Sequence, residues 1–270
     1  MHSTALQNQR THSILGRSVA TLRTYPLAMQ AAAANRASFG MQLSFMVAND
    51  AIWLIFWVLV FGHAETIRGW QLDEFFVLFG ISTFAAGVAF GAFGGLRDTA
   101  KVLASGEIDA LLTQPSPVYL RMLVRRVDVP MLGDIIFGMA MFALSGHGAS
   151  VSHWVLFLGT AMCAGVMMSA FIAAAHSLTF LLGGKPQVAS LASNAALVFT
   201  MYPISIFGGA LKLILFTVVP TALITAIPAQ MVLHFSYGKL LIVVLSMLGL
   251  SLIGVLAYSG GLRHYRRHSL

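Results

Sequence analysis

The sequence predicts an all-α membrane protein with six transmembrane helices. Hydrophobic residues make up 58% of the 270-residue chain and charged residues only 9%, a composition that excludes an ordinary soluble domain. Long apolar runs recur along the chain, separated by short polar or glycine- and proline-containing stretches. A helix needs about 20 apolar residues to cross the hydrocarbon core of a bilayer, so the length fits about six spans with short connections.

The first 40 residues are mixed in character and lack the continuous apolar core of a signal peptide. We therefore expect an uncleaved cytoplasmic start. Within it, residues 27–39 alternate small and apolar side chains with Gln30, Asn35 and Arg36, which is typical of a helix lying along the inner leaflet. The alternative is a simple polar lead-in to the first span.

The predicted spans form one transmembrane domain over residues 41–262, which is followed by a basic cytoplasmic tail over residues 263–270. Each span is an apolar run bounded by a polar loop or a tight turn, such as Gly183-Gly184-Lys185-Pro186. The six spans are expected over residues 41–62, 73–95, 127–145, 154–182, 187–207 and 240–258.

Gly87, Gly91 and Gly95 recur every fourth residue in the second span. Such a stripe of small residues permits two membrane helices to approach closely, although glycine is also generally more common in membrane helices. Three glycines in register favour a packing seam. We expect this seam to line a substrate pathway or a boundary between subunits.

Three polar residues lie inside predicted spans: Asn49 and Asp50 in the first, and Asp134 in the third. Acidic side chains are costly in the membrane and therefore suggest function. Asp50 has no nearby cation in the sequence, and it either lines a polar pathway or subunit seam or is satisfied by packing. Asp128 also lies early in the third span, and for both Asp128 and Asp134 a structural ion pair with Arg125 or Arg126 is an equal alternative.

The most polar interior segment covers residues 97–117, between the second and third spans. Arg97 and Lys101 are four residues apart and would share one face of a helix. Gly106 can end that helix in a left-handed conformation.

A second short helix follows in the same segment. Glu107 and Asp109 suit its first turn, where the helix dipole favours negative charge, and Pro115 and Pro117 stop it. We expect two short amphipathic helices at the membrane surface. A solvated loop between two spans is the alternative.

Residues 208–237 are apolar but interrupted by Pro220 and Pro228, with Pro203 just upstream. Each proline removes a backbone donor and disturbs a helical turn, and the resulting pieces are shorter than the ~20 residues that cross a membrane. We expect a re-entrant helical hairpin that acts as a gate on the outer side. The alternative is a kinked span that would place the C-terminus outside.

The basic residues fix the expected orientation. In the six-span arrangement, only Arg68, Lys212 and Lys239 face one side of the membrane. The opposite side is richer in basic residues and is therefore cytoplasmic. Both termini are then inside, and the net charge of +7 reflects topology rather than nucleic-acid binding. The residues on the richer side are Arg10, Arg17, Arg23, Arg36, Arg97, Lys101, Arg121, Arg125, Arg126, Lys185, Arg263, Arg266 and Arg267.

Several kinds of chemistry have no signature in the sequence. There is no phosphate-binding G-x-x-x-x-G-K-[ST] loop, because Pro186 follows Lys185 where a helix would have to begin. There is no zinc motif and no G-x-S-x-G motif, and the single cysteine, Cys163, cannot form an internal disulfide. We therefore expect no catalysis, no metal and no cofactor in this chain.

Two patterns resemble a known family. Ser105–Leu112 followed by Pro115 resembles the cytoplasmic signature of type 2 export permeases of ATP-binding-cassette (ABC) transporters. The motifs Met201–Phe207, Val219-Pro220 and Ile227–Ala229 are similar to the C-terminal pattern of a small six-span branch of these permeases. The patterns occur in the family's order, and the resemblance covers nearly the whole chain.

The resemblance implies a permease subunit of an exporter in a prokaryotic plasma membrane. Its partners would be two ABC ATPase subunits, which bind ATP and magnesium, a second permease subunit that is identical or a sister chain, and membrane lipid. The substrate would be a lipid-like, drug-like or glycan-like molecule. The residues expected to contact the ATPase are Arg97, Lys101, Ser105, Gly106, Glu107, Ile108, Asp109, Leu111, Leu112 and Pro115.

Two other functions remain open from the sequence. An ion-coupled secondary transporter could use Asp50 and Asp134 as proton or sodium sites, but it would be expected to show internal repeats, and none is evident. A membrane-assembly subunit without transport is the second alternative. A stoichiometric ATPase partner would distinguish the permease from both.

Overall fold

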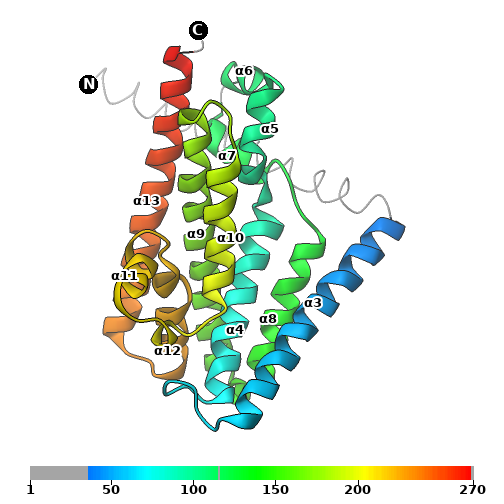
Figure 1. Ribbon diagram of the computed structural model, residues 1–270, viewed down its shortest axis with the longest axis vertical. Helices are drawn as coiled ribbons and strands as arrows, with labels where there is room; N and C mark the ends of the chain where they lie inside the picture. Colours follow the sequence, from blue (N-terminus) through cyan, green and yellow to red (C-terminus); the bar gives the residue numbers. More distant parts are fainter. Residues whose placement is uncertain (1–35, 115, 269–270) are drawn as a thin grey trace, which may run out of the picture.

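The computed structural model describes residues 36–114 and 116–268, and its regular structure is helical (Figure 1). Among those residues, β pairing is limited to one isolated bridge between Ile67 and Trp70. The predicted all-α class is therefore confirmed. The surface helix expected over residues 27–39 lies mostly outside the described residues, and so does Pro115.

Long helices alternate with short 3-10 or π-helical turns, which are labelled η. In chain order the elements are α3 (Arg36–His63), α4 (Leu72–Ala86), η1 (Gly87–Ala92), η2 (Gly94–Asp98), α5 (Thr99–Ala104), α6 (Glu107–Leu112), α7 (Val118–Val124), η3 (Pro130–Leu132), α8 (Gly133–Leu144), η4 (His147–Ala149), α9 (Val151–Leu181), α10 (Gln187–Thr200), η5 (Ile204–Ile206), α11 (Gly209–Thr217), η6 (Ala222–Ala226), α12 (Ile227–Leu233) and α13 (Tyr237–His268).

Four of the described helices are long and apolar enough to cross a membrane: α3, α4 continued by η1, α9 and α13. They coincide with the first, second, fourth and last predicted spans. A fifth is added if α11 and the η6–α12 helix, which meet at a bend of 72°, form one broken span. By length and composition, the chain has the helices of an integral membrane protein.

Two predicted spans are shorter than expected. The third begins at Pro130 and ends at Leu144, just before Gly146 reverses the chain in a left-handed conformation. The fifth, α10, ends at Thr200, because Pro203 disfavours helical backbone in the residue before it. Both helices have fewer residues than the ~20 that cross a bilayer without help from their flanks.

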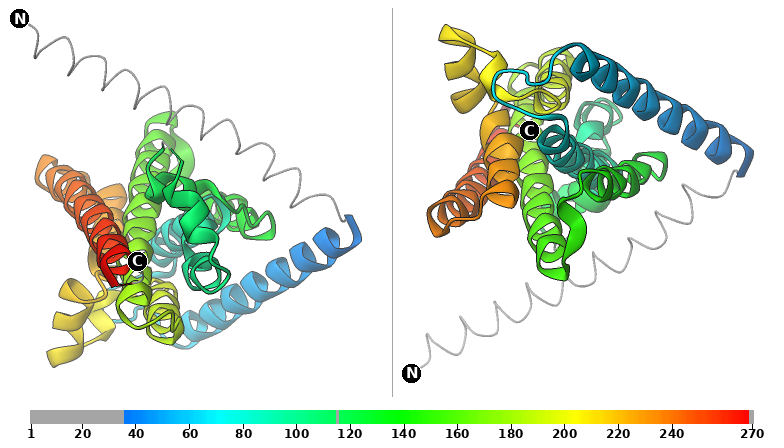
Figure 2. Two further views of the ribbon diagram at one scale, coloured as in Figure 1. Left: turned by 90° about the horizontal axis from the view of Figure 1, so that it is seen from above. Right: turned by 90° about the horizontal axis from the view of Figure 1, so that it is seen from below.

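Helix α9 is central to the bundle, and α13 packs along it. Gly254 and Gly261 of α13 permit this close contact, since a Cβ atom there would lie 2.6 Å from the Ala170 carbonyl oxygen and 2.8 Å from that of Ser177. In the helix formed by α4 and η1, 89% of the most apolar 18-residue stretch is buried inside the bundle. The corresponding stretches of α3 and α13 are each only 11% buried. The core is therefore built around α4 and α9, with α3 and α13 outside (Figure 2).

Helix α3 touches the bundle along one narrow face. Its buried side chains are Asp50, Trp57 and Phe61, which the helical repeat places on one side. Trp57 lies 4.3 Å, between ring centroids, from Phe75 of α4. The remaining apolar side chains of α3 are mostly exposed, as expected for a helix that meets lipid.

The two ends of the bundle have different architecture (Figure 1). The upper end, as drawn, carries α5, α6, α7, the turn between α9 and α10, and the C-terminal turns of α13. The lower end carries the connection from α3 to α4, together with α11 and α12. Residues 263–268, expected as a separate tail, continue α13 as helix, since no proline or left-handed glycine intervenes.

At the lower end, only one of the two prolines breaks the helix. Pro220 separates α11 from η6. The prediction that Pro228 also cuts the segment is wrong, because it lies in the first turn of α12 and the chain runs straight into it from η6. The π-helical turn of η6 changes the hydrogen-bond register just upstream, which accommodates a residue without an N–H donor.

Candidate functional site

Helices α5 and α6 form a compact hairpin, residues 99–112, at the upper end of the molecule (Figure 1). Gly106 joins them with φ of +71°, the left-handed conformation that the sequence predicted there and that side chains disfavour. The Asp109 amide donates to the Gly106 carbonyl at 3.2 Å. One glycine thus sets the angle between the two short helices.

The hairpin has an apolar side and a polar side. Val102 and Ile108 are completely buried and fix it to the bundle. Lys101, Glu107 and Asp109 are exposed. Ser105 and Gly106 are also exposed at the tip, while Leu111 and Leu112 are half-buried. Two short amphipathic helices, rather than a loop, occupy this segment.

Arg97 does not share a helical face with Lys101, and this expectation was wrong. Residues 94–98 form the 3-10 turn η2, and α5 begins only at Thr99. The Arg97 guanidinium lies 4.8 Å above the Phe90 ring centroid, a cation–π contact. Arg97 therefore lies at the base of the hairpin and not at its exposed tip.

Glu107 forms a two-bond ion pair with Arg125, which directly follows α7. The guanidinium donates to the two carboxylate oxygens at 2.8 Å and 2.7 Å. Hydrogen bonding to Arg125 lowers the pKa of Glu107, and the same bond raises the pKa of Arg125. Paired oxygens and nitrogens fix orientation as well as distance, so the start of α6 is oriented relative to α7.

Arg121 fixes the other end of α6. Its guanidinium contacts the carbonyl oxygens of Leu111 at 3.0 Å, Gln114 at 3.2 Å and Ser116 at 2.6 Å, and it also donates to the Gln114 side-chain oxygen. The last carbonyls of a helix have no partner within the helix, and a nearby arginine can supply one. Arg121 therefore caps α6 and holds the chain that follows it.

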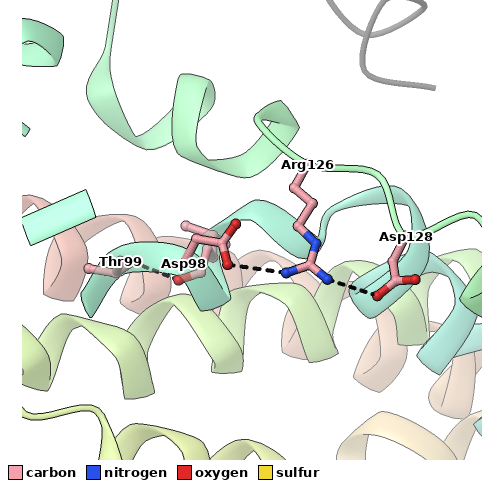
Figure 3. Close-up of polar contacts among 5 residues, drawn as sticks. Asp98, Thr99, Arg126 and Asp128 are labelled. Atoms are coloured by element: carbon pink, nitrogen blue, oxygen red, sulfur yellow. Dashed lines mark hydrogen bonds and ion pairs between the residues drawn. The ribbon is translucent and has the colours of Figure 1, made fainter. Parts of the chain in front are cut away.

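Arg126 joins the base of the hairpin to the start of the next apolar segment. Its guanidinium lies between Asp98 at 3.3 Å and Asp128 at 3.4 Å (Figure 3). The Asp128 amide donates to the Gly91 carbonyl at 2.9 Å. The ion pair predicted between these arginines and an acid of the third span is thus made by Asp128. Asp134 makes no salt bridge among the described residues.

A buried hydroxyl pair connects the hairpin to the last helix. The Thr99 hydroxyl and the Tyr258 hydroxyl are 3.1 Å apart, and both residues are completely buried. The Thr99 hydroxyl also donates to the Leu96 carbonyl at 2.6 Å. The two hydroxyls therefore link the start of α5 directly to α13.

The glycine stripe makes its close contacts within the chain. A Cβ atom at Gly87 would meet the Ile135 amide nitrogen at 2.9 Å, and one at Gly91 would meet that of Leu132 at 3.0 Å. One at Gly95 would collide with the Met122 carbonyl oxygen. The seam predicted from these glycines therefore has residues 122–135, from α7 to the start of α8, as its partner, rather than a second subunit.

Asp50 and Asp134 come together between α3 and α8. Each is only 4% exposed, and their carboxyl groups lie close enough to interact. The Asn49 amide donates to Asp50 at 3.4 Å, and one oxygen of Asp134 has no partner among the described residues. The sequence pointed to both acids separately but not to their contact.

Sequence reasoning missed the structural role of Arg121, Arg125 and Arg126, which it used only to assign the side of the membrane. A signal was present. Arg121 and Arg125 are spaced by four residues, as are residues on one helical face, and the nearby hairpin carries acids. What the sequence lacked was the fold-back that brings residues 107 and 125 together.

The fold and this site define a helical membrane protein with a rigid polar hairpin at one end, the arrangement expected of a transport permease. The sequence profile described as "ABC-2 family transporter protein" matches residues 47–269. The chain therefore belongs to the ABC-2 transporter family, whose members are membrane components of transporters that work with ABC ATPase partners. No curated protein and no solved structure matches the chain.

Proposed function

We propose that the chain is the permease subunit of an ABC exporter and that the hairpin of residues 99–112 docks on a separate ATPase subunit. One observation carries the proposal. Arg121, Arg125 and Tyr258 hold the hairpin to the bundle, but Lys101, Gly106 and Asp109 remain exposed. A rigid element with a free mixed-charge tip suits the transfer of motion from a partner. ATP and magnesium would be bound by that partner.

Asp109 and Glu107 have different roles in this proposal. Glu107 is engaged by Arg125, so it positions the hairpin. Asp109 is exposed and makes no salt bridge among the described residues, so it is available to a cation on the ATPase. Pro115 and Leu112 would end the docking segment, and Arg97 would support it from below.

Charge reversal tests this division of roles. Asp109→Lys should abolish the ATP hydrolysis that the permease stimulates in its copurified ATPase, because it repels the partner's cation. Glu107→Arg should weaken it by misplacing α6, and the swap Glu107→Arg with Arg125→Glu should restore it. Glu65→Lys, an equal charge change in the exposed connection after α3, is the control and should have no effect.

Normal hydrolysis with both Asp109→Lys and Glu107→Arg would refute the docking assignment. If the charge swap fails to restore hydrolysis while Glu107→Arg reduces it, Glu107 itself would contact the partner. Insertion of each variant into the membrane would be verified by its detergent-extracted yield, so that loss of protein is not taken for loss of coupling.

The proposed membrane arrangement has six spans, with α8 and α10 among them, and both termini in the cytoplasm. Two features support it. The basic residues gather at the hairpin end, and α11 and α12 both lie at the lower end, where α10 ends and α13 begins (Figure 1). In this arrangement, the segment of residues 208–237 re-enters the outer leaflet and gates the pathway around Pro203, Pro220 and Pro228.

A reporter fused after Leu270 tests the topology. Cytoplasmic activity is expected, because a non-crossing segment of residues 208–237 leaves an even number of spans. With Cys163 replaced, a cysteine at Glu65 should react with an impermeant thiol reagent outside intact cells, and one at Ser105 should not. External reporter activity would contradict the hairpin, and external labelling of Ser105 would invert the whole arrangement.

The exported substrate, lipid-like, drug-like or glycan-like, would move by alternating access in a complex of two permease subunits and two ATPases. Asn49 and the Asp50–Asp134 contact supply a polar point between α3 and α8 in an otherwise apolar membrane region. Intramembrane acids of this kind mark pathways more often than surfaces. We therefore assign this point to the substrate path.

A further inference from the structure

The second half of the chain carries positive charge with no acidic side chain. After Asp134 the sequence contains no aspartate or glutamate, yet it contains six lysines and arginines: Lys185, Lys212, Lys239, Arg263, Arg266 and Arg267. Four of these lie at the upper end, one beside the turn between α9 and α10 and three on the last turns of α13. All four are exposed, and none makes a salt bridge among the described residues.

Each of these cations is within two residues of a residue that lines a cavity. It has a volume of about 520 Å³, which lies within the range of small-molecule sites. Its walls come from α5, from the end of α9 with the turn that follows, and from α13. The lining residues are Leu103, Ala104, Phe180, Leu181, Gly183, Gly184, His264 and Tyr265.

The walls are mainly apolar, and the basic residues adjoin them in sequence. Phe180 is 4% exposed, and its ring lies 6.3 Å from that of Tyr265. Gly183 and Gly184 have φ of +63° and +83°, so the turn presents backbone instead of side chains. Leu103 of α5 reaches this turn, since its Cδ2 would lie 3.7 Å from a Cβ atom at Gly184.

The length of α13 leads us to expect the cavity at the depth of lipid headgroups. Helix α13 has 32 residues and is about 48 Å long at ~1.5 Å per residue, whereas the hydrocarbon core is ~30 Å thick. Its last turns therefore leave the apolar region. Clusters of lysine and arginine directly after a transmembrane helix, and basic pockets between such helices, attract anionic lipid.

We propose that this cavity binds an anionic phospholipid, with the phosphate at the rim formed by Lys185 and the α13 arginines and the first acyl methylenes against Phe180 and Leu181. The general preference for basic residues on the cytoplasmic side of a membrane would explain the positive charge here, but it would not explain the cavity. A soluble phosphate would match the rim but leave the apolar wall unused. Placing this lipid in the cytoplasmic leaflet rests on the proposed function, whereas the proposed binding does not.

The test is lipid retention by the purified full-length chain. Native mass spectrometry would compare dioleoylphosphatidylglycerol with dioleoylphosphatidylcholine, titrated into the chain in detergent, with no ATPase present. Phosphatidylglycerol should be retained preferentially. Arg266→Gln with Arg267→Gln should reduce its retention by about fivefold per charge, since each such charge contributes about 1 kcal/mol near an anionic surface. The control variant, Arg68→Gln with Lys212→Gln, removes two positive charges from the other end of the protein and should not cause this loss.

A second pair of variants tests the cavity rather than the charge. Ala104→Phe should fill it and reduce phosphatidylglycerol retention, while Ala110→Phe, on the exposed side of α6, should not. Equal retention of both lipids, or equal losses in test and control variants, would overturn the proposal. So would displacement of the lipid by millimolar inorganic phosphate, which would identify a site for the free anion. Since no ATPase is present, these outcomes are separate from any failure of coupling.

Discussion

Two groups of arginines occupy the same end of this protein, and they differ in what surrounds them. Arg121, Arg125 and Arg126 follow one another around the end of α7 and meet carboxylates and helix carbonyls of the hairpin. The arginines of α13 are exposed and have no acidic partner among the described residues. The sequence marks both groups equally as cytoplasmic. Their neighbours make one group part of the protein framework and leave the other available to a ligand.

The difference depends on backbone proximity as much as on charge. Gly95 allows η2 to lie against the end of α7, where a Cβ atom would meet the Arg125 amide at 3.1 Å and collide with the Met122 carbonyl. This contact brings Asp98 within reach of Arg126. The chain contains no acid after Asp134, and the arginines of α13 make no salt bridge among the described residues.

The largest expected effect comes from separating the first group from its partners. Gly95→Val should destabilise the protein by about 1–3 kcal/mol, as overpacking at a close backbone contact does, and should free Arg125 and Arg126 from the hairpin. The measurement is a thermal or denaturant unfolding curve in detergent. Gly159→Val is the control, because a Cβ atom there meets nothing within 4 Å, and equal destabilisation by both would refute the contact.

A more local effect, confined to α6, is expected from Arg121. Arg121→Ala leaves the last carbonyls of α6 without their cap, and hydrogen bonds to a charged donor contribute about 1.5–3 kcal/mol. Hydrogen exchange of the α6 amides should therefore accelerate about tenfold or more. Arg121→Lys should recover only part of the protection, because an ammonium cannot reproduce the guanidinium fork.

The matched control for Arg121 belongs to the other group. Arg263→Ala removes the same charge at the same end of the protein and should leave α6 exchange unchanged. If the two substitutions accelerated α6 exchange equally, the distinction between framework and ligand-binding arginines would fail.

The smallest effect is a pH dependence of the Glu107–Arg125 pair. The pKa of Glu107 is lowered in the folded protein, so the pair stabilises α6 above the ordinary pKa of about 4.5 and loses this contribution as pH falls below it. Because the pair is solvent-exposed, the change should be less than about fivefold in α6 protection. Glu107→Gln should remove the difference between pH 7 and acid pH, and an unchanged pH response in that variant would assign it to other acids.

The sequence predicted this fold in its local features. Gly106 required a left-handed break, and the structure has it there. Pro220 separates two short helices, and the apolar runs around residues 41–62 and 154–182 became α3 and α9 with ends shifted by a few residues. Each of these features depends on a residue's own conformational limits or on its nearest neighbours.

Other features were decided by tertiary structure. Pro228 looked like a second break, but the π-helical turn of η6 accommodates it. The glycine stripe looked suited to another subunit, but residues 122–135 of the same chain fill the space. In both cases the outcome depends on what lies opposite the residue, which a local pattern does not contain.

By itself, the sequence determined the class of protein and the position of the hairpin, since composition, helix length and glycine conformation are properties of the chain. Only the tertiary structure decided which charges are paired. Glu107 and Arg125 are 18 residues apart, and Asp98 and Arg126 are 28 apart. Ionic contacts require approach to a few ångströms, and that approach is set by how η2, α6 and α7 fold back on one another.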